Sequence, residues 1–125
     1  MSDATSAVMV ISFGGQFLTV PSVSGRCCPG GKREPSDRST EETAIRETLE
    51  ESGFVIRECV FVFQKLVGEH LCDCYFATSW IDLSKPELLT RWLTPAEMVS
   101  REAGEIRFPD WNAEMLALLP PEAWR

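Results

Sequence analysis

Apolar residues recur in short strand-like runs at the start of this 125-residue chain. The runs 7–13 and 16–20 are rich in Val, Ile, Leu and Phe, and Gly14-Gly15 stands between them. Two β-favouring segments on either side of a two-residue glycine turn are typical of a hairpin. The pattern therefore predicts a β-hairpin at the N-terminus.

Two longer β-favouring runs follow the middle of the chain. Residues 54–66 and 70–80 carry apolar side chains at strand-like spacing, with Gly68-Glu69 between them. This pattern predicts a second pair of strands joined by a turn. The sequence also predicts a short strand at Trp92-Leu93 and irregular connections at 20–28 and 84–90.

Between these strand pairs the spacing becomes helical, and one helix is predicted over about 40–52. Ser39, with Glu42 three residues later, has the spacing of a capping box, and Gly53 can take the left-handed conformation that ends many helices. Two further helices are predicted, one capped by Thr94 with Pro95 in its first turn and one over 109–119.

The order of these elements predicts a single domain over residues 1–125. Apolar residues make up 44% of the sequence, which is enough for one hydrophobic core. Helices in the middle and at the end of a strand-rich chain require helical layers around a sheet. The predicted fold class is therefore α/β, with a mixed β-sheet between helices.

Three glutamates of the predicted central helix share one face. Glu47, Glu50 and Glu51 are spaced i, i+3 and i+4, so their side chains lie over one another. An isolated cluster of this kind is more often a solvated acidic surface. The preceding turn 29–31 changes the interpretation, because its glycines let the carbonyl of Gly31 approach the carboxylates. Since hard divalent ions prefer oxygen ligands, the pattern predicts a metal site.

Residues 46–54, Arg-Glu-Thr-Leu-Glu-Glu-Ser-Gly-Phe, resemble the end of the Nudix box, R-E-U-x-E-E-x-G-U, in which U is a bulky apolar residue. With the glycine turn, the resemblance extends over about residues 30–54. It implies a small MutT-like Nudix hydrolase with an α/β/α sandwich fold. It also implies hydrolysis of a nucleoside diphosphate linked to another group, with Mg²⁺ as cofactor and Mn²⁺ as a substitute.

The resemblance implies roles for individual residues. Glu47, Glu50, Glu51 and the Gly31 carbonyl would bind the metal, and Arg46 would orient the carboxylates. Glu47 and Glu50 are the leading candidates for the catalytic base, with Glu47 first. A carboxylate from a later loop is the alternative, and the candidates are Glu87, Glu97, Glu102 and Glu105.

Two positions depart from the family pattern. Thr48 stands where a bulky apolar residue is usual, which should affect packing more than chemistry. Asp37 follows Gly31 at the interval usual for an acidic residue of the family, but it precedes Arg46 by one residue too many. The loop before the helix is therefore expected to be one residue longer than usual.

The C-terminal segment gives the main indication of a substrate, because it is similar to the part of MutT-like members that reads a purine. Asn112 could pair with a base edge while Trp111, Phe108 or Trp92 stacks on the ring. The structural alternatives are a helix cap and a core tryptophan. Lys32 and Arg33 are candidate phosphate contacts, followed by Arg26, Lys65 and Arg91.

A nucleoside triphosphate or related nucleotide is thus the expected substrate, and ADP-ribose, dinucleotides and coenzyme A are the alternatives. A Nudix-fold nucleotide sensor without hydrolysis is the alternative from another class. Such a sensor would be expected to lose the carboxylates of the box, whereas Arg46 and all three glutamates are present.

Composition bears on partners and location. The 12 Lys and Arg residues are outnumbered by 19 Asp and Glu, giving a net charge of −7, so nonspecific nucleic-acid or acidic-membrane binding is not expected. No apolar run is long enough to span a bilayer, and the N-terminus has no signal-peptide pattern. We therefore expect a soluble, cytoplasmic protein, for which the resemblance implies a homodimer.

The five cysteines are odd in number and form no C-x-x-C pair, so neither a disulfide framework nor a zinc site is predicted. His70 has no Cys or His at ligand spacing, which favours a structural or exposed role. Cys27 and Cys28 adjoin the glycine turn, and one of them is expected near the site.

Overall fold

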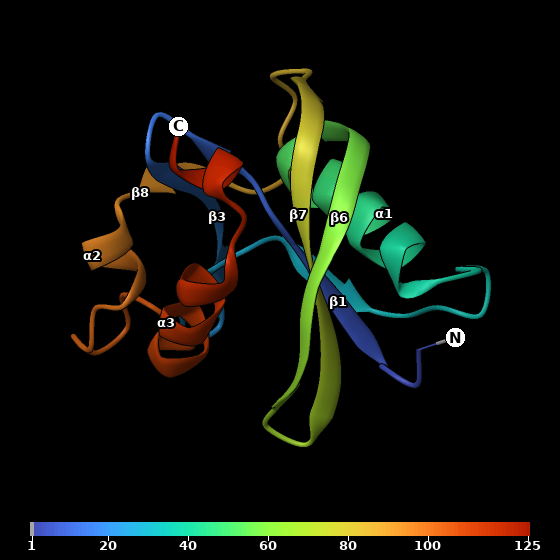
Figure 1. The fold of residues 1–125 in the computed structure, drawn as a ribbon, viewed down its shortest axis with the longest axis horizontal. Helices are drawn as coiled ribbons and strands as arrows, with labels where there is room; N and C mark the ends of the chain where they lie inside the picture. Colours follow the sequence, from blue (N-terminus) through green and yellow to red (C-terminus); the bar gives the residue numbers. More distant parts are fainter. Residues whose placement is uncertain (1) are drawn as a thin grey trace.

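The computed structural model describes residues 2–125, and Figure 1 shows them as twisted strands with helices on either side. The strands are β1 (Ser6–Val10), β2 (Ser12–Phe13), β3 (Gln16–Ser22), β4 (Gly25–Cys27), β5 (Gly30–Lys32), β6 (Phe54–Val67), β7 (His70–Asp82) and β8 (Arg91–Leu93). The helices are α1 (Thr40–Ser52), α2 (Pro95–Met98), α3 (Pro109–Leu118) and the 3-10 helix η1 (Pro121–Trp124). The predicted central and last helices, long strand pair and short strand at 92–93 are confirmed.

The main sheet is mixed. Its strands lie in the order β5-β1-β7-β6, with β1 parallel to β7 and the other pairs antiparallel. In a second, smaller sheet β3 pairs with β2, β4 and β8, all antiparallel. The predicted α/β class with a mixed sheet between helices is confirmed, and the smaller sheet is an addition to it.

The predicted N-terminal hairpin is only partly correct. Ser12–Phe13 pair with β3 across Gly14-Gly15, whose φ angles of 59° and 77° suit the turn. Ser6–Val10 instead cross into the main sheet, where β1 pairs with β5 and β7. Pairing with a strand far along the chain therefore takes precedence over pairing across the nearby turn.

The stretch 20–28, predicted to be irregular, forms a second hairpin. Ser22 is opposite Gly25, so β3 and β4 are joined by a two-residue loop. Gly25 has a φ of 130°, and a Cβ there would lie 2.9 Å from the backbone carbon of Ile106. Glycine is needed at this position both for the turn and for the close approach of the later segment. The other predicted connection, 84–90, is irregular.

Helix α1 lies on one face of the main sheet (Figure 1). Ala7 and Met9 of β1 are fully buried against Ala44, whereas Val10 belongs to the core on the other side. Thr48 is also fully buried, and its Oγ1 donates to the Ala44 carbonyl at 2.6 Å, so the polar residue leaves no unsatisfied hydroxyl.

The ends of α1 follow the predicted signals, with one difference. Ser39 Oγ accepts from the Glu42 N–H at 3.2 Å, and Gly53 ends the helix with a φ of 74°. The Glu42 carboxylate bonds to the N–H and side chain of Arg38 and not to Ser39, so only half of the capping box forms.

A second apolar core fills the space between the two sheets. Val10 and Phe76 of the main sheet meet Phe17 and Leu93 of the smaller sheet, and Trp111 of α3 packs against them. This core fixes the start of α3 relative to the main sheet.

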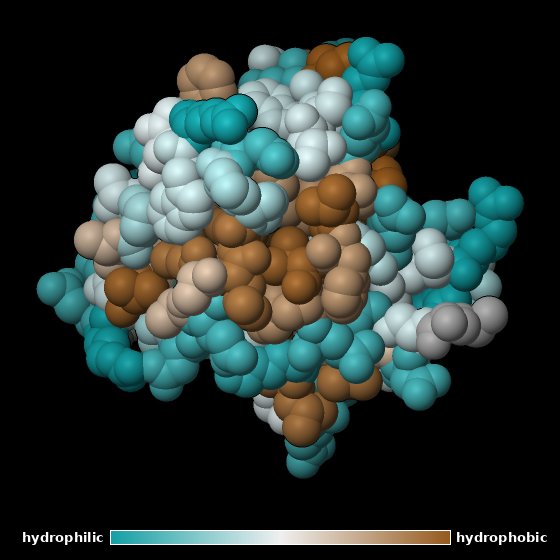
Figure 2. Space-filling model, in the orientation of Figure 1, coloured by the Kyte–Doolittle hydropathy of each residue, from teal (hydrophilic) through white to brown (hydrophobic). Residues whose placement is uncertain are grey.

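Apolar side chains also reach the surface on the face shown in Figure 2, over the part of the molecule where α3 and β6 lie in Figure 1. The exposed apolar residues of these two elements include Val60, Phe61, Leu66 and Leu118. Within residues 2–125, no helix is long and apolar enough to cross a membrane.

Candidate active site

Arg46 connects the acidic face of α1 to the loop before the helix. Its Nε and Nη2 donate to Oδ1 and Oδ2 of Asp37 at 3.0 and 2.8 Å, a two-pronged contact with one carboxylate. Its Nη1 donates to Glu47 Oε1 at 3.0 Å and to Glu50 Oε2 at 3.4 Å. One guanidinium therefore donates hydrogen bonds to three carboxylates and brings Glu47 and Glu50 to the same nitrogen.

Asp37 anchors this arrangement. Only 5% of its side chain is exposed, and it also accepts from the Glu34 N–H and the Thr43 hydroxyl, both at 2.9 Å. These donors, Arg46 first among them, hold the pKa of Asp37 well below its usual range, and the same contact raises the pKa of Arg46. Although the loop before α1 is one residue longer than the family pattern, Asp37 still contacts Arg46.

The two glycines of β5 lie directly against glutamates of α1. The Gly30 N–H donates to Glu51 Oε1 at 2.9 Å. A Cβ added at Gly31 would lie 2.6 Å from Cδ of Glu47 and 2.7 Å from its Oε1. The strand can approach the helix this closely only where it has no side chains. Glu47 and Glu51 therefore converge on adjacent residues of β5.

Gly31→Ala is expected to displace Glu47 while the fold is retained, because the new methyl group would meet the end of a flexible side chain. We expect activity to fall by about 10- to 100-fold and the free energy of unfolding to change by less than about 1 kcal/mol. Steady-state kinetics and urea denaturation measure the two effects.

Gly30→Ala provides the contrast for this substitution. A Cβ at residue 30 would lie 2.4 Å from the backbone oxygen of Ala7. This oxygen belongs to β1, so it can move only if the sheet itself shifts. We expect this variant to lose about 1–3 kcal/mol of stability. A fully active Gly31→Ala protein would contradict a functional role for the contact between β5 and Glu47.

Burial and mutual repulsion disfavour the charged forms of these carboxyl groups. The pKa of Glu51 is raised to about 7, first by burial and then by the charges of Glu47, Glu50 and Glu87, although the Gly30 N–H acts in the opposite direction. Burial also raises the pKa of Glu47, against the effect of Arg46. A cation placed beside this cluster would relieve the repulsion.

Within residues 2–125, no three His, Cys, Asp or Glu side chains are gathered closely enough to form a preassembled metal centre. The predicted ligand oxygens accept hydrogen bonds from Arg46 and Gly30 instead. Their chemistry nevertheless fits a hard divalent cation, because three mutually repelling carboxylates share one face of α1. The three predicted carboxylate ligands thus share one face of α1, but their oxygens do not converge on a single point.

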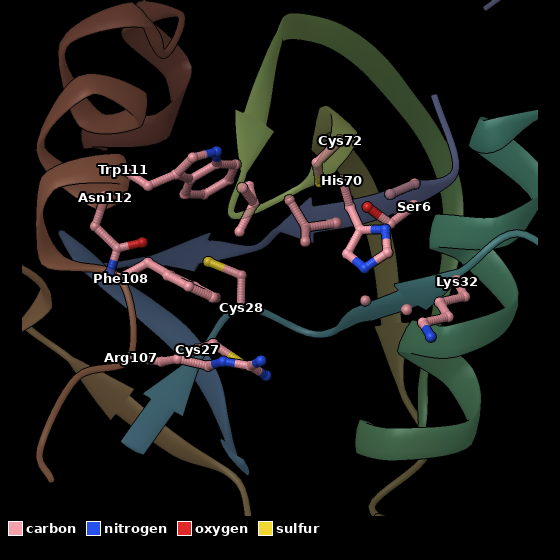
Figure 3. Close-up of a pocket in the computed structure, with 15 residues that line it drawn as sticks. Ser6, Cys27, Cys28, Lys32, His70, Cys72, Arg107, Phe108, Trp111 and Asn112 are labelled. Atoms are coloured by element: carbon pink, nitrogen blue, oxygen red, sulfur yellow. The ribbon is translucent and has the colours of Figure 1, made fainter. Parts of the chain in front are cut away.

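A cavity of about 240 Å³ lies beside β5, lined by residues of β1, β4, β5 and β7 and by the start of α3. Figure 3 shows Trp111, Asn112 and Phe108 at one side of it and Lys32 and His70 at the other. Helix α1 lies beyond Lys32 in the same view. The cavity therefore extends from an aromatic and amide end to the glycine strand that contacts the α1 glutamates.

Four of the predicted substrate contacts, namely Lys32, Phe108, Trp111 and Asn112, line the cavity. Arg33 lies outside it, and its side chain donates to the carbonyls of Asp37 and Arg38. Arg33 therefore supports the loop that carries Asp37. The prediction that it contacts phosphate finds no support in this geometry.

Asn112 and Trp111 are more constrained than the sequence suggested. Asn112 Nδ2 donates to the buried Met98 carbonyl at 2.7 Å, and its Oδ1 turns toward the cavity (Figure 3), so only the acceptor half of the predicted paired contact faces a ligand. Trp111 is 8% exposed and packs on Phe63, with ring centroids 5.2 Å apart. No side chain of the first turn caps α3.

Arg107 is a site residue that the sequence pattern does not indicate, and His70, expected to be structural or exposed, belongs to the site as well. Both residues line the cavity. The available signal for Arg107 was its position next to Phe108, above whose ring its Cζ lies at 4.8 Å from the centroid. Cys27 and Cys28 line the cavity as well, which agrees with the expectation that one of them lies near the site.

The surroundings of Cys27 connect the cavity with α1. Burial is the main cause that raises the pKa of its thiol; the charge of Glu51 raises this pKa further, and the charge of Arg107 lowers it. Cys27 is therefore close enough to both groups to respond to their charges. All five cysteines are free thiols.

The other predicted contacts have different partners. Glu87 is the one later-loop candidate whose charge acts on Glu51. Pairs outside the cavity join Lys65 with Glu114, Arg91 with Glu97, Ser100 with Glu105, and Arg26 with the Leu89 carbonyl. Trp92 packs with Phe13, Phe54 and Trp80, so its predicted stacking on a base is not supported.

The sequence model of the NUDIX domain family matches residues 2–119. The chain belongs to this family. The predicted enzyme class, a Nudix hydrolase, is thereby confirmed. No protein of curated function matches the sequence significantly.

Solved structures show the extent of the Nudix fold in this chain. It is similar to a MutT NUDIX hydrolase from Burkholderia pseudomallei, with 15% identity, a TM-score of 0.70 and coverage of 94% of this chain and 98% of that one. A MutT structure from work on Aliivibrio salmonicida and Vibrio cholerae has 20% identity, a TM-score of 0.68 and coverage of 93% and 98%. The pyrophosphohydrolase BsRppH of Bacillus subtilis has 22% identity, a TM-score of 0.67 and coverage of 94% and 84%.

Proposed function

We propose that this Nudix chain hydrolyses a phosphoanhydride bond of a nucleoside triphosphate or related nucleotide, with Mg²⁺ as cofactor and Mn²⁺ as a substitute. The observation that carries the proposal is the position of β5, which touches the α1 glutamates and also lines a cavity with aromatic and amide side chains. A nucleotide has matching parts, because its phosphates suit the first surface and its base suits the second.

In this proposal, Glu47, Glu50 and Glu51 hold the cation with the carbonyl of Gly31. Arg46 fixes the orientation of Glu47 and Glu50 through its Nη1. The bound metal supplies Lewis acidity toward the phosphate and lowers the pKa of water. Glu47 takes the proton of the attacking water, a role supported by its partly buried position and raised pKa. Attack in line at phosphorus expels the phosphate-containing leaving group.

The cavity residues orient the rest of the substrate. Lys32 follows Gly31 in β5 and supplies a cation for a phosphate. Asn112 Oδ1 supplies an acceptor, which favours a base that presents an N–H group. Phe108 offers an apolar ring beside it.

Two alternatives to this proposal are a different diphosphate substrate and a function without hydrolysis. ADP-ribose, dinucleotides and coenzyme A also contain a diphosphate, so the same glutamates would serve them. A nucleotide-binding sensor without hydrolysis is the second candidate function. The retention of Arg46 and all three glutamates of the box favours the hydrolase over this sensor.

The proposal is tested by incubating the protein with Mg²⁺ and a panel of nucleoside triphosphates, ADP-ribose, dinucleotides and coenzyme A, with products separated by chromatography. We expect a nucleoside triphosphate to be hydrolysed, the reaction to stop when EDTA removes the metal, and Mg²⁺ or Mn²⁺ to restore it. Turnover without any divalent ion would contradict the mechanism. Tight nucleotide binding without turnover of any substrate would favour the sensor.

A further inference from the structure

Main-chain contacts hold Arg107 at the rim of the cavity. Its N–H donates to the Arg26 carbonyl at 3.1 Å, and the Arg26 N–H donates to the Glu105 carbonyl at 2.9 Å, so this segment runs beside β4 like an added strand. The missing side chain of Gly25 allows the close approach. The position of Arg107 is therefore set by the backbone, and its exposed side chain is not needed to hold the segment.

The guanidinium of Arg107 has no acceptor among residues 2–125. Its Cζ lies over the Phe108 ring, 4.8 Å from the centroid, a cation–π contact that uses none of its N–H groups as hydrogen-bond donors to an oxygen. Carboxylates or carbonyls engage most other basic side chains, namely Arg26, Arg33, Arg38, Arg46, Lys65, Arg91 and Arg101. Arg107 and Lys32 are instead the basic residues of the cavity lining.

The direction of the side chain adds a second observation. Figure 3 shows the guanidinium extending from Phe108 past Cys27, away from Asn112. Cys27 is close enough to both Arg107 and Glu51 to respond to their charges. The guanidinium thus lies on the route from the base end of the cavity to the carboxylate helix, in a chain whose net charge is −7. An uncompensated cation at this place is suited to an anionic part of a ligand.

We propose that Arg107 binds the phosphate chain of the nucleotide by donating two N–H groups to oxygens of one phosphate. The planar fork of a guanidinium matches the geometry of a phosphate, and the cation–π contact with Phe108 positions it before the ligand arrives. The inference rests on the proposed function, since it identifies the residue that selects a phosphorylated ligand over the matching nucleoside.

The experiment measures binding in EDTA, so that neither metal nor turnover contributes. Isothermal titration calorimetry compares ADP with adenosine and GDP with guanosine in the wild type, Arg107→Met, Arg107→Lys and Arg57→Met. We expect Arg107→Met to weaken diphosphate binding by about tenfold or more while nucleoside binding is unchanged, and Arg107→Lys to recover part of the loss. Arg57→Met, which removes an exposed cation of β6 outside the cavity, is expected to match the wild type.

Three results would overturn the inference: unchanged diphosphate affinity in Arg107→Met, equal weakening of nucleoside and diphosphate, or no preference of the wild type for the diphosphate. Hydrolysis assays on the same preparations separate this question from the proposed function. Metal-dependent turnover with unchanged diphosphate binding in Arg107→Met overturns the phosphate contact alone. A diphosphate-selective loss in a protein without turnover supports the contact and overturns the hydrolase. Circular dichroism checks that each variant is folded.

Discussion

Glu47→Gln is expected to lower kcat by about 10²- to 10⁴-fold, with a much smaller change in KM. The substitution removes the proposed proton acceptor and one negative charge from the metal donor set. It keeps the size of the side chain, and the amide oxygen can still accept from Arg46 Nη1, so the fold should be retained. Steady-state kinetics at saturating Mg²⁺ measure the effect.

Glu41→Gln is the matched control for this prediction, because Glu41 lies on the same helix in an exposed position against Cys59. Its activity should remain near that of the wild type. Undiminished turnover in Glu47→Gln, or an equal loss in both variants, would contradict the assigned role. A loss that higher Mg²⁺ concentrations reverse would assign Glu47 to metal affinity and not to proton transfer.

Asp37→Asn is expected to lower the free energy of unfolding by about 2–3 kcal/mol. The change breaks a charge-assisted, two-pronged contact and leaves Arg46, whose side chain is 24% exposed, without its main partner. Activity should also fall, because Arg46 orients Glu47 and Glu50. Urea denaturation and kinetics measure the two effects. Glu34→Gln is the control, since Glu34 is 3.7 Å from Arg46 and 58% exposed, and it should cost less than about 0.5 kcal/mol.

The same contact predicts how stability depends on pH. The pKa of Asp37 in the folded protein is lowered, chiefly by Arg46, whereas the unfolded value is about 3.9. A depressed folded-state pKa contributes its full stability above about pH 5 and loses it as the pH falls. We therefore expect the unfolding free energy of the wild type to fall more steeply between about pH 5 and 3 than that of Asp37→Asn. Equal acid sensitivity would assign this loss to other carboxyl groups.

The carboxylate face of α1 could be predicted because it depends on local geometry. The helical repeat alone places Glu47, Glu50 and Glu51 together, and the signals at Ser39 and Gly53 fix the ends of the helix. The partner of Arg46 was harder to predict. In the sequence, Asp37 lies one residue farther from Arg46 than the family pattern has it. A loop can compensate for such a shift, and here Asp37 still reaches the guanidinium.

The cavity could not be predicted, because its wall is assembled from segments far apart in the sequence. Lys32 and Cys27 meet His70 and Arg107 only after β1 has paired in parallel with β7 and α3 has packed between the sheets. The N-terminal hairpin was misplaced for the same reason, since the pattern around the glycine turn contains no information about the distant β7. Nor could the sequence reveal that the amide nitrogen of Asn112 donates a hydrogen bond to the Met98 carbonyl.

The contact between Gly30 and Glu51 also bears on self-association. Strand β5 is one of the two edge strands of the main sheet, and the edge of a sheet offers unpaired N–H groups to any other chain. The Glu51 carboxylate covers one of these groups, so it shields the edge against intermolecular strand pairing. A ligand that drew this carboxylate away would uncover the N–H and leave the strand edge open to pairing. Variants at Glu51 should therefore be judged by light scattering as well as by turnover.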